Sequence, residues 1–114
     1  MKIKINETGK IETLNLIDPV TNTDYITNFI GNHRAFLDGQ FNYDDADDVF
    51  LTSQETYDWW YKVVNDQQVL VNRLNDLRSV YKVHVIMDVI NTVSCDLEDH
   101  AQYVNDALDK AFNI

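Results

Sequence analysis

Residues 53–81 read SQETYDWWYKVVNDQQVLVNRLNDLRSVY and contain neither glycine nor proline. Ser53 stands where a helix N-cap is expected, and Glu55 falls in the first turn, where a carboxylate complements the helix dipole. The stretch therefore predicts one long helix, of about 40 Å at about 1.5 Å per residue. Its apolar residues recur at helical spacing, and they are Trp60, Val63, Val64, Leu70, Val71, Leu74, Leu77 and Tyr81.

The residues before this helix predict short strands. Residues 2–6 and 10–17 alternate polar and apolar side chains on either side of a turn at 7–9, and Pro19 ends the second run. This pattern is typical of a β-hairpin. A short helix is expected next, over residues 24–30.

A second hairpin is predicted just before the long helix. Residues 40–43 and 49–52 have the composition of strands, and they flank the sequence DDADD at 44–48. Like charges in a turn resist burial, so we expect this acidic tip to face water.

The segment after the long helix is ambiguous. Residues 83–93 read VHVIMDVINTV, and their β-branched side chains are typical of a strand. The apolar positions also fit the i, i+3, i+4, i+7 spacing of a helix face, so we expect a helix. Asp96 is then expected to cap a last helix, whose inward residues would be Leu97, Ala101, Val104, Leu108, Ala111 and Phe112.

Together these elements predict an α+β fold. An N-terminal β-hairpin, a short helix, a second acidic β-hairpin and three C-terminal helices would pack on one core. At 114 residues the chain fits one domain, 1–114.

The charge of the chain is strongly negative and unevenly distributed. There are 19 Asp and Glu residues against 9 Lys and Arg, which gives a formal net charge of −10. Residues 35–58 hold seven of the acids and residues 83–109 hold six, and neither range contains a Lys or Arg. A surface this acidic repels phosphate backbones and anionic lipids, so we expect no direct nucleic-acid or membrane binding. Basic proteins are the favoured partners.

The remaining composition predicts a folded cytoplasmic protein. Hydrophobic residues make up 45% of the chain, well above what acidic disordered tails contain. No run approaches the roughly 18 apolar residues of a membrane helix, and the start of the chain lacks the apolar stretch of a secretory signal. Cys95 is the only cysteine, so no disulfide can form within the chain.

Metal ligation at the acidic tip is disfavoured by the spacing. An EF-hand loop starting at Asp44 would place Ala46 at the third position, which needs an oxygen ligand, and Val49 at the sixth, which needs glycine. His33, His84 and His100 show no paired ligand spacing. We therefore expect no metal and no cofactor.

The chain also lacks the usual sequence signs of an enzyme. There is no GxSxG elbow, and the three glycines are isolated, so they form no phosphate-cradling loop. Cys95 precedes the last helix, where a thiol pKa can fall, but the neighbouring acids oppose the thiolate. We expect a protein that is not an enzyme, with a small enzyme or cation-binding protein as an alternative.

Two adjacent tryptophans have different expected roles. Neighbouring positions on a helix point about 100° apart, so Trp59 and Trp60 cannot both occupy the centre of one buried stripe. Trp60 is expected in the core. Either Trp59 covers the neighbouring hairpin, or Trp59, or Tyr57 and Tyr61 near it, anchors a partner, since exposed aromatic residues dominate binding hot spots.

One segment resembles known proteins. Residues 41–64, FNYDDADDVFLTSQETYDWWYKVV, combine an acidic turn, a short aromatic strand and the sequence Q-E-x-aromatic-D-W-W. This segment resembles small acidic proteins carried by conjugative elements and phages of Gram-positive bacteria, and residues 95–112, CDLEDHAQYVNDALDKAF, are similar in style. Antirestriction and anti-CRISPR proteins occur among such cargo, and several act as acidic decoys. The resemblance implies a class of activity and identifies no functional residue.

The leading hypothesis is a non-enzymatic, DNA-mimic-like inhibitor of a basic nucleic-acid-handling enzyme. If the acidic tip and the last helix lie on the same side, their carboxylates would form a combined patch that occupies a nucleic-acid channel. The expected partner-binding residues are Asp44, Asp45, Asp47, Asp48, Glu98, Asp99, Asp106 and Asp109, with Tyr57 and Trp59 as anchors.

Two other interpretations stay open. In the first, the protein would be an accessory interaction module of a mobile element without inhibitory role. Its apolar helix face would then pair with a partner helix, or with a second copy as a homodimer. Alternatively, the acids only keep the protein in solution.

Overall fold

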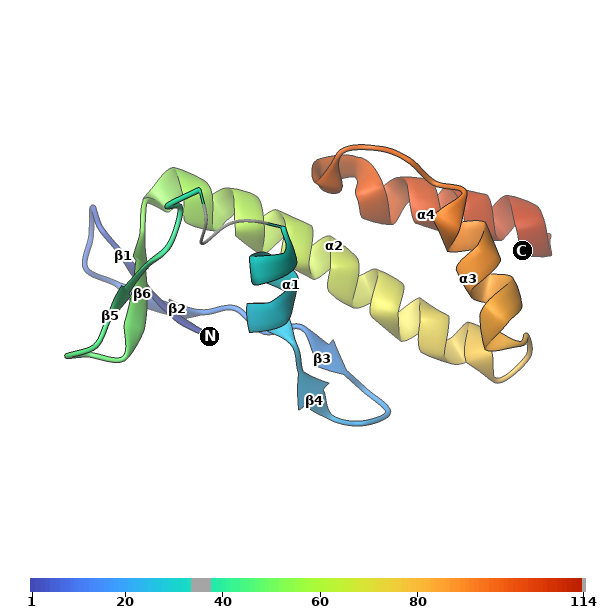
Figure 1. Cartoon of the computed structure of the whole chain (residues 1–114), viewed down its shortest axis with the longest axis horizontal. Coiled ribbons are helices and arrows are strands. Elements are labelled where there is room, and N and C mark those ends of the chain that lie inside the picture. Colours follow the sequence, from blue (N-terminus) through green and yellow to red (C-terminus); the bar gives the residue numbers. More distant parts are fainter. Residues whose placement is uncertain (34–37, 114) are drawn as a thin grey trace.

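The chain forms an α+β fold, with its strands and one short helix in the first half and three helices in the second (Figure 1). The computed structural model describes residues 1–33 and 38–113. The arrangement of strands followed by helices confirms the predicted α+β fold class.

Four strands form the main sheet, and they are β1 (Lys2–Ile5), β2 (Ile11–Thr13), β5 (Asn42–Asp44) and β6 (Val49–Thr52), in the order β2-β1-β6-β5. The two predicted hairpins are present as β1–β2 and β5–β6. A parallel pairing of β1 with β6, in which Ile3 lies opposite Phe50, joins them into one sheet. The sequence pattern predicts the two hairpins but not the pairing between them.

A second, two-stranded sheet corrects the first predicted hairpin. The strand expected to continue to residue 17 ends at Thr13, and a separate strand, β3 (Ile17–Asp18), pairs with β4 (Thr23–Asp24). Helix α1 (Ile26–Asn32) therefore begins two residues later than expected. The Asp24 carboxylate explains the shift, because its Oδ1 accepts hydrogen bonds from the backbone N–H of Leu16, at 2.9 Å, and of Ile26, at 3.1 Å.

The long helix is α2 (Gln54–Arg78), close to the predicted range. Ser53 is its N-cap, as expected, and its Oγ accepts a hydrogen bond from the backbone N–H of Thr56 at 3.1 Å. The Glu7 carboxylate accepts a second first-turn N–H, that of Gln54, at 2.7 Å. The start of α2 is thus tied to the turn that follows β1.

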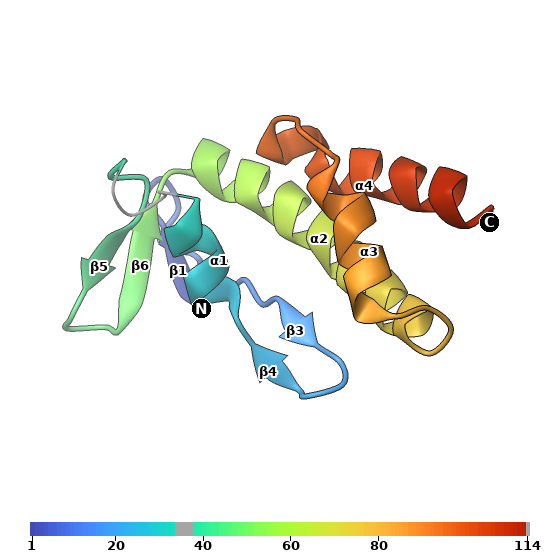
Figure 2. The same cartoon turned by 45° about the vertical axis from the view of Figure 1, so that its right-hand side comes forward.

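Helices α3 (Val83–Asn91) and α4 (Leu97–Phe112) follow α2, and α4 packs against both α2 and α3 (Figure 2). The ambiguous segment is therefore a helix, as expected, with Ile86 fully buried. Asp96 occupies the N-cap position of α4, but its side chain accepts no capping hydrogen bond from the described residues. The expectation of a side-chain cap at Asp96 is wrong.

The buried side chains form two clusters instead of the single core expected, and α2 contributes to both. The first lies between the sheet, α1 and the first half of α2, and contains Ile3, Ile5, Leu14, Leu16, Ile26, Ile30, Phe41, Tyr57, Trp60, Val63 and Val64. The second lies among α2, α3 and α4, and contains Leu70, Leu77, Ile86, Ala101, Val104 and Leu108. Because the clusters follow one another along α2, the molecule is elongated, with extents of 48 × 28 × 21 Å.

One residue expected to point inward from α4 does not. Ala101, Val104 and Leu108 are buried as predicted, and Leu97 and Phe112 are partly buried, but Ala111 is exposed.

In residues 1–33 and 38–113, no helix has both the length and the apolar character needed to cross a bilayer.

Candidate binding surfaces

The acidic tip is an ordered turn between β5 and β6. The Asp44 Oδ1 accepts the backbone N–H of Ala46 at 3.0 Å, and Asp48 adopts a left-handed backbone conformation with φ of 53°, which Asp tolerates better than most residues. The Tyr43 hydroxyl donates a hydrogen bond to the Asp48 carboxylate. Local hydrogen bonds therefore hold the carboxylates in place at the turn.

The charge of the tip is compensated only in part. Lys4 approaches Asp47, with 4.0 Å between Nζ and Oδ2, and both side chains are exposed. No other tip carboxylate is in an ion pair with a described residue. The pKa of the Tyr43 hydroxyl is raised, first by its hydrogen bond to Asp48 and then by desolvation and the surrounding carboxylates. The tip is a local concentration of negative charge directed into solvent.

The acids of α4 differ in their surroundings. Glu98 and Asp99 lie in the first turn, where they complement the positive end of the helix dipole, and both are exposed. Asp106 is exposed and is in no ion pair with a described residue. These three carboxylates are therefore exposed to solvent.

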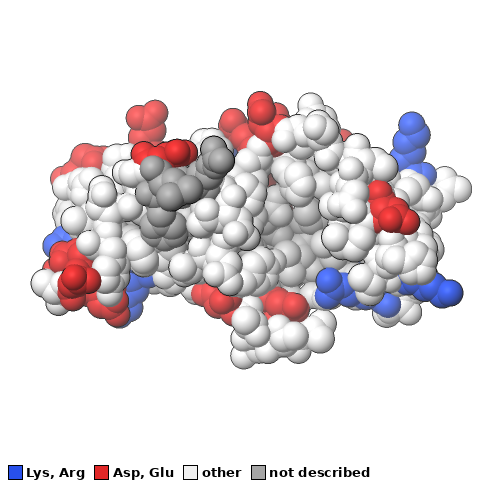
Figure 3. Space-filling model, viewed as in Figure 1, with Lys and Arg blue, Asp and Glu red and all other residues white. Residues whose placement is uncertain are grey.

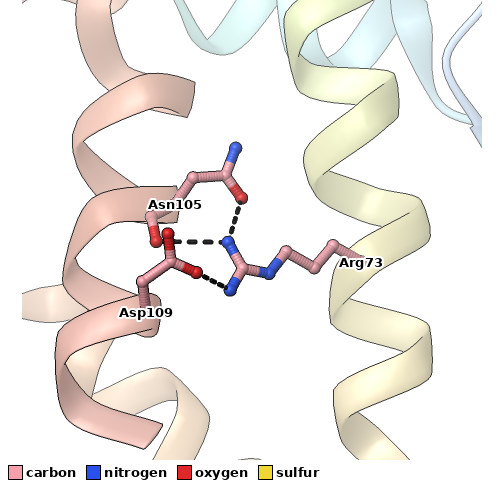
Figure 4. A network of polar contacts seen from close by, with 3 residues as sticks. All are labelled: Arg73, Asn105 and Asp109. Atoms are coloured by element: carbon pink, nitrogen blue, oxygen red, sulfur yellow. Dashed lines mark hydrogen bonds and ion pairs between the residues drawn. The ribbon is translucent and has the colours of Figure 1, made fainter. Parts of the chain in front are cut away.

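Asp109 has a different environment from the one expected. Its carboxylate forms an ion pair with the guanidinium of Arg73 on α2 (Figure 4). Arg73 also donates hydrogen bonds to the Asn105 backbone carbonyl, at 3.1 Å, and to its side-chain oxygen, at 2.9 Å. The sequence interpretation left the outer face of α4 without a compensating base, because this pairing joins residues that are 36 positions apart.

The two acidic blocks do not form the combined patch that the hypothesis requires. The β5–β6 tip lies at one end of the long axis, and α4 lies in the other half of the molecule (Figure 1). In the space-filling view of that face, acidic side chains appear in separate groups with uncharged surface between them (Figure 3). A partner could contact the tip and α4 only as two separate regions.

The predicted aromatic anchors differ in exposure. Tyr57 is only 8% exposed and belongs to the first buried cluster, so it does not offer the surface that an anchor needs. Trp60 is buried as predicted, and its Nε1 donates a hydrogen bond to the Gln40 side chain at 3.0 Å. Trp59 is 36% exposed and packs edge-on against Trp60, with ring centroids 4.9 Å apart. Tyr61, at 50%, is the more exposed neighbour.

The chemically reactive side chains are scattered. In the described part of the chain, no group of three or more His, Cys, Asp or Glu residues is arranged to hold a metal ion. His100 shares a 3.0 Å hydrogen bond with Gln67 of α2, and desolvation lowers its pKa, with a smaller effect from His33. The pKa of the exposed Cys95 thiol is raised by desolvation and by Asp99 and Asp96, as the neighbouring acids predicted.

A surface that the sequence interpretation did not identify lies between α3 and α4. An open groove of about 560 Å³ is lined by Asp88, Val89, Thr92, Ala107, Lys110 and Ala111. Its signal in the sequence is the composition of α3, in which six of the nine residues are apolar and only His84, Asp88 and Asn91 are polar, so the apolar face is wider than one buried contact needs. Val83, Val85 and Met87 remain exposed as a consequence.

No protein-family model, no curated protein and no solved structure matches this chain.

Proposed function

We propose that this protein is a non-enzymatic, cytoplasmic binding protein that inhibits a basic nucleic-acid-handling enzyme. The observation that carries the proposal is the excess of carboxylates at the surface that are in no ion pair with a described residue: the half-buried Asp44 and the exposed Asp45 and Asp48 at the tip, and the exposed Glu98, Asp99 and Asp106 on α4. The choice of partner class follows the resemblance given for residues 41–64 in the sequence, for which no curated protein gave a match.

The separation of the acidic regions changes the expected mode of binding. A single mimic of a DNA strand would need closely spaced charges, since duplex DNA has one charge per about 1.7 Å of its axis. Two regions at different places along a 48 Å molecule instead favour contacts with two basic patches of the partner. Such contacts steer association and weaken as ionic strength rises.

The test is charge reversal at the tip. Changing Asp44, Asp45, Asp47 and Asp48 to Lys moves the net charge from −10 to −2, because each substitution adds two units. We expect this variant to lose inhibition of DNA cleavage by a restriction endonuclease or a Cas nuclease that the parent protein inhibits. Unchanged inhibition would remove the tip from the mechanism.

A matched control separates the tip from total charge. The control changes four acids elsewhere to Lys, which gives the same net charge: Asp38, Glu55, Asp58 and Asp76. All four side chains are exposed, and none belongs to the tip or to α4. We expect this control to keep most of the inhibition, and circular dichroism checks that both variants are folded. Equal loss in both variants would show that only the overall charge matters.

The exposed apolar side chains of α3 favour a second candidate, an interaction module without inhibitory role. This function predicts a complex or a dimer that is insensitive to salt. Sedimentation over a series of salt concentrations distinguishes it from charge-driven binding.

A further inference from the structure

A small pocket lies beside the first two turns of α2, where the residues before β5 meet the helix. Its volume is about 310 Å³, and in the described part of the chain it is lined by Gln40, Glu55, Thr56 and Trp59. This volume is at the lower end of the ~300–1,000 Å³ found for small-molecule sites, so the pocket suits a group of the size of one side chain. None of the four residues belongs to a buried cluster or to the acidic tip.

The lining combines one negative charge with one aromatic ring. Glu55 and Trp59 are four residues apart on α2, so their side chains are neighbours on one helix face. Glu55 is exposed and is in no ion pair with a residue in 1–33 or 38–113. No lysine or arginine is among the described lining residues. The pocket therefore attracts cations and repels anions.

The Trp59 ring keeps at least one face clear of its neighbour Trp60. It is 36% exposed, and the two rings are T-shaped, with an interplanar angle of 90°. In such a pair the edge of one ring points at one face of the other, so Trp60 covers at most one face of Trp59. The electron-rich face of an indole attracts a cation that lies within about 6 Å of the ring centroid.

Hydrogen bonds fix the two polar walls of the pocket. The Gln40 side-chain oxygen accepts the Trp60 indole N–H at 3.0 Å, and the Gln40 backbone carbonyl accepts the Thr52 hydroxyl at 2.6 Å. The Thr56 hydroxyl oxygen accepts the Ser53 hydroxyl at 2.9 Å within the N-cap of α2. Each of the two side-chain oxygens has a second lone pair for a donor of a ligand. These acceptors are in place before a ligand arrives, which lowers the cost of binding.

We propose that this pocket binds a guanidinium group. A guanidinium is planar and positively charged, so it can stack on Trp59 and pair with the Glu55 carboxylate. It has five N–H donors and no acceptor, which suits a lining that also offers the oxygens of Gln40 and Thr56. A lysine ammonium has the same charge but neither the plane nor the fork of donors. The inference goes beyond the proposed function, which gives this pocket no role.

Three blocked amino acids test the proposal: N-acetyl-argininamide, its citrulline analogue and N-acetyl-lysinamide. The citrulline compound keeps the planar shape without the charge, and the lysine compound keeps the charge without the plane. In NMR titrations at constant ionic strength, we expect the arginine compound to bind at least about fivefold more tightly than the citrulline compound and at least about twofold more tightly than the lysine compound. The Trp59 indole N–H and the backbone amides of Glu55 and Thr56 should shift most.

Free arginine distinguishes two sources of the guanidinium. It has a charged amino group and a carboxylate at Cα, which the blocked compound lacks. Tighter binding of the blocked compound indicates an arginine side chain within a protein, and tighter binding of free arginine indicates a small metabolite.

Matched variants locate the site. Glu55→Gln removes the charge and Trp59→Leu removes the ring, and each should lower the affinity for the arginine compound at least about threefold. Asp76→Asn makes the same charge change farther along α2, and Tyr61→Leu removes a ring that is 50% exposed and does not line the pocket. We expect these controls to change the affinity less than about 1.5-fold, because solvent screens distant surface charges. Circular dichroism checks the fold, and Glu55→Gln decides the test if Trp59→Leu does not fold.

Three results would overturn the proposal. The citrulline or lysine compound binds as tightly as the arginine compound, the shifts concentrate at residues 44–48, or the variants lose no more affinity than their controls. The proposed function fails separately. Its charge control includes Glu55→Lys, so that variant should keep most of the inhibition and lose binding of the arginine compound.

Discussion

Arg73 joins the two longest helices of the molecule. Its side chain is 25% exposed and contacts both Asn105 and Asp109 on α4. The Asp109 side chain is 49% exposed. Arg73→Ala removes these hydrogen bonds and leaves the Asn105 oxygens without the donor. We expect the free energy of unfolding to fall by about 1–2 kcal/mol, the lower part of the range for charged hydrogen bonds, because solvent screens the pair. Urea denaturation measures the change.

Arg78→Ala is the matched control on the same helix. Arg78 is exposed, and its guanidinium contacts the Asn75 side chain within α2 at 3.2 Å. We expect a change in unfolding free energy within about 0.5 kcal/mol, as for most surface substitutions. Equal effects of the two substitutions would show that the contact with α4 contributes nothing to stability.

His100 gives the fold a pH dependence. Desolvation lowers the pKa of its imidazole below the ordinary value of about 6.5. The unfolded chain therefore binds a proton at a higher pH than the folded one, so stability decreases as pH falls below about 6.5. We expect His100→Gln, which retains an acceptor for Gln67, to lose less stability between pH about 7.5 and about 5.5 than the parent protein does.

His84→Gln is the comparison for this pH effect, because His84 is exposed on α3. Its loss of stability over the same pH interval should equal that of the parent protein. If His84→Gln and His100→Gln behave alike, the pH dependence comes from other groups.

Single residues were predictable where their role is local. The Ser53 cap and the burial of Trp60 follow from helix spacing and N-cap chemistry, and both are confirmed. The burial of Tyr57 also follows from local spacing, since it stands three and seven residues before Trp60 and Val64 and so shares their buried helix face. The pairing of Asp109 with Arg73 depends on elements distant in the chain, and nothing in the neighbouring residues signals it.

At the scale of elements, the N-cap of α2 supports the longest helix. The Ser53 Oγ accepts the Thr56 backbone N–H and donates to the Thr56 hydroxyl at 2.9 Å. We expect Ser53→Ala to lower the free energy of unfolding by about 1 kcal/mol and Ser53→Asp to restore most of it, because Asp is an equally good N-cap. Thermal or urea unfolding of the three proteins measures this. Equal stability of Ser53→Ala and the parent protein would contradict the role of the cap.

Helices were easier to predict than strand pairing for a physical reason. A helix satisfies its backbone hydrogen bonds within itself, so its spacing is visible in a short stretch, as for α2, α3 and α4. The parallel pairing of β1 with β6 joins Ile3 to Phe50, and no local pattern encodes such a partner. The strands β3 and β4 have two residues each, too few for a recognisable alternation.

At the scale of the molecule, the acid blocks were visible in the sequence but their arrangement was not. Their separation follows from α2, which at about 37 Å places the sheet and the helical cluster at different positions along one axis. The α3–α4 groove was missed because it depends on which part of the broad apolar face of α3 meets α4.

The shared helix also predicts how the molecule unfolds. Both buried clusters are built on α2, and Val69 lies near its middle with a side chain that is 64% exposed. Val69→Pro removes a backbone hydrogen bond and clashes with the preceding turn, which costs about 3 kcal/mol or more. We expect tryptophan fluorescence, which reports the first cluster, and far-UV circular dichroism to give coincident unfolding curves in the parent protein and separate curves in the variant. Val69→Ala should keep the curves coincident, since it leaves the helix intact. Coincident curves in Val69→Pro would mean that contacts such as that between Gln67 and His100 couple the clusters without a continuous α2.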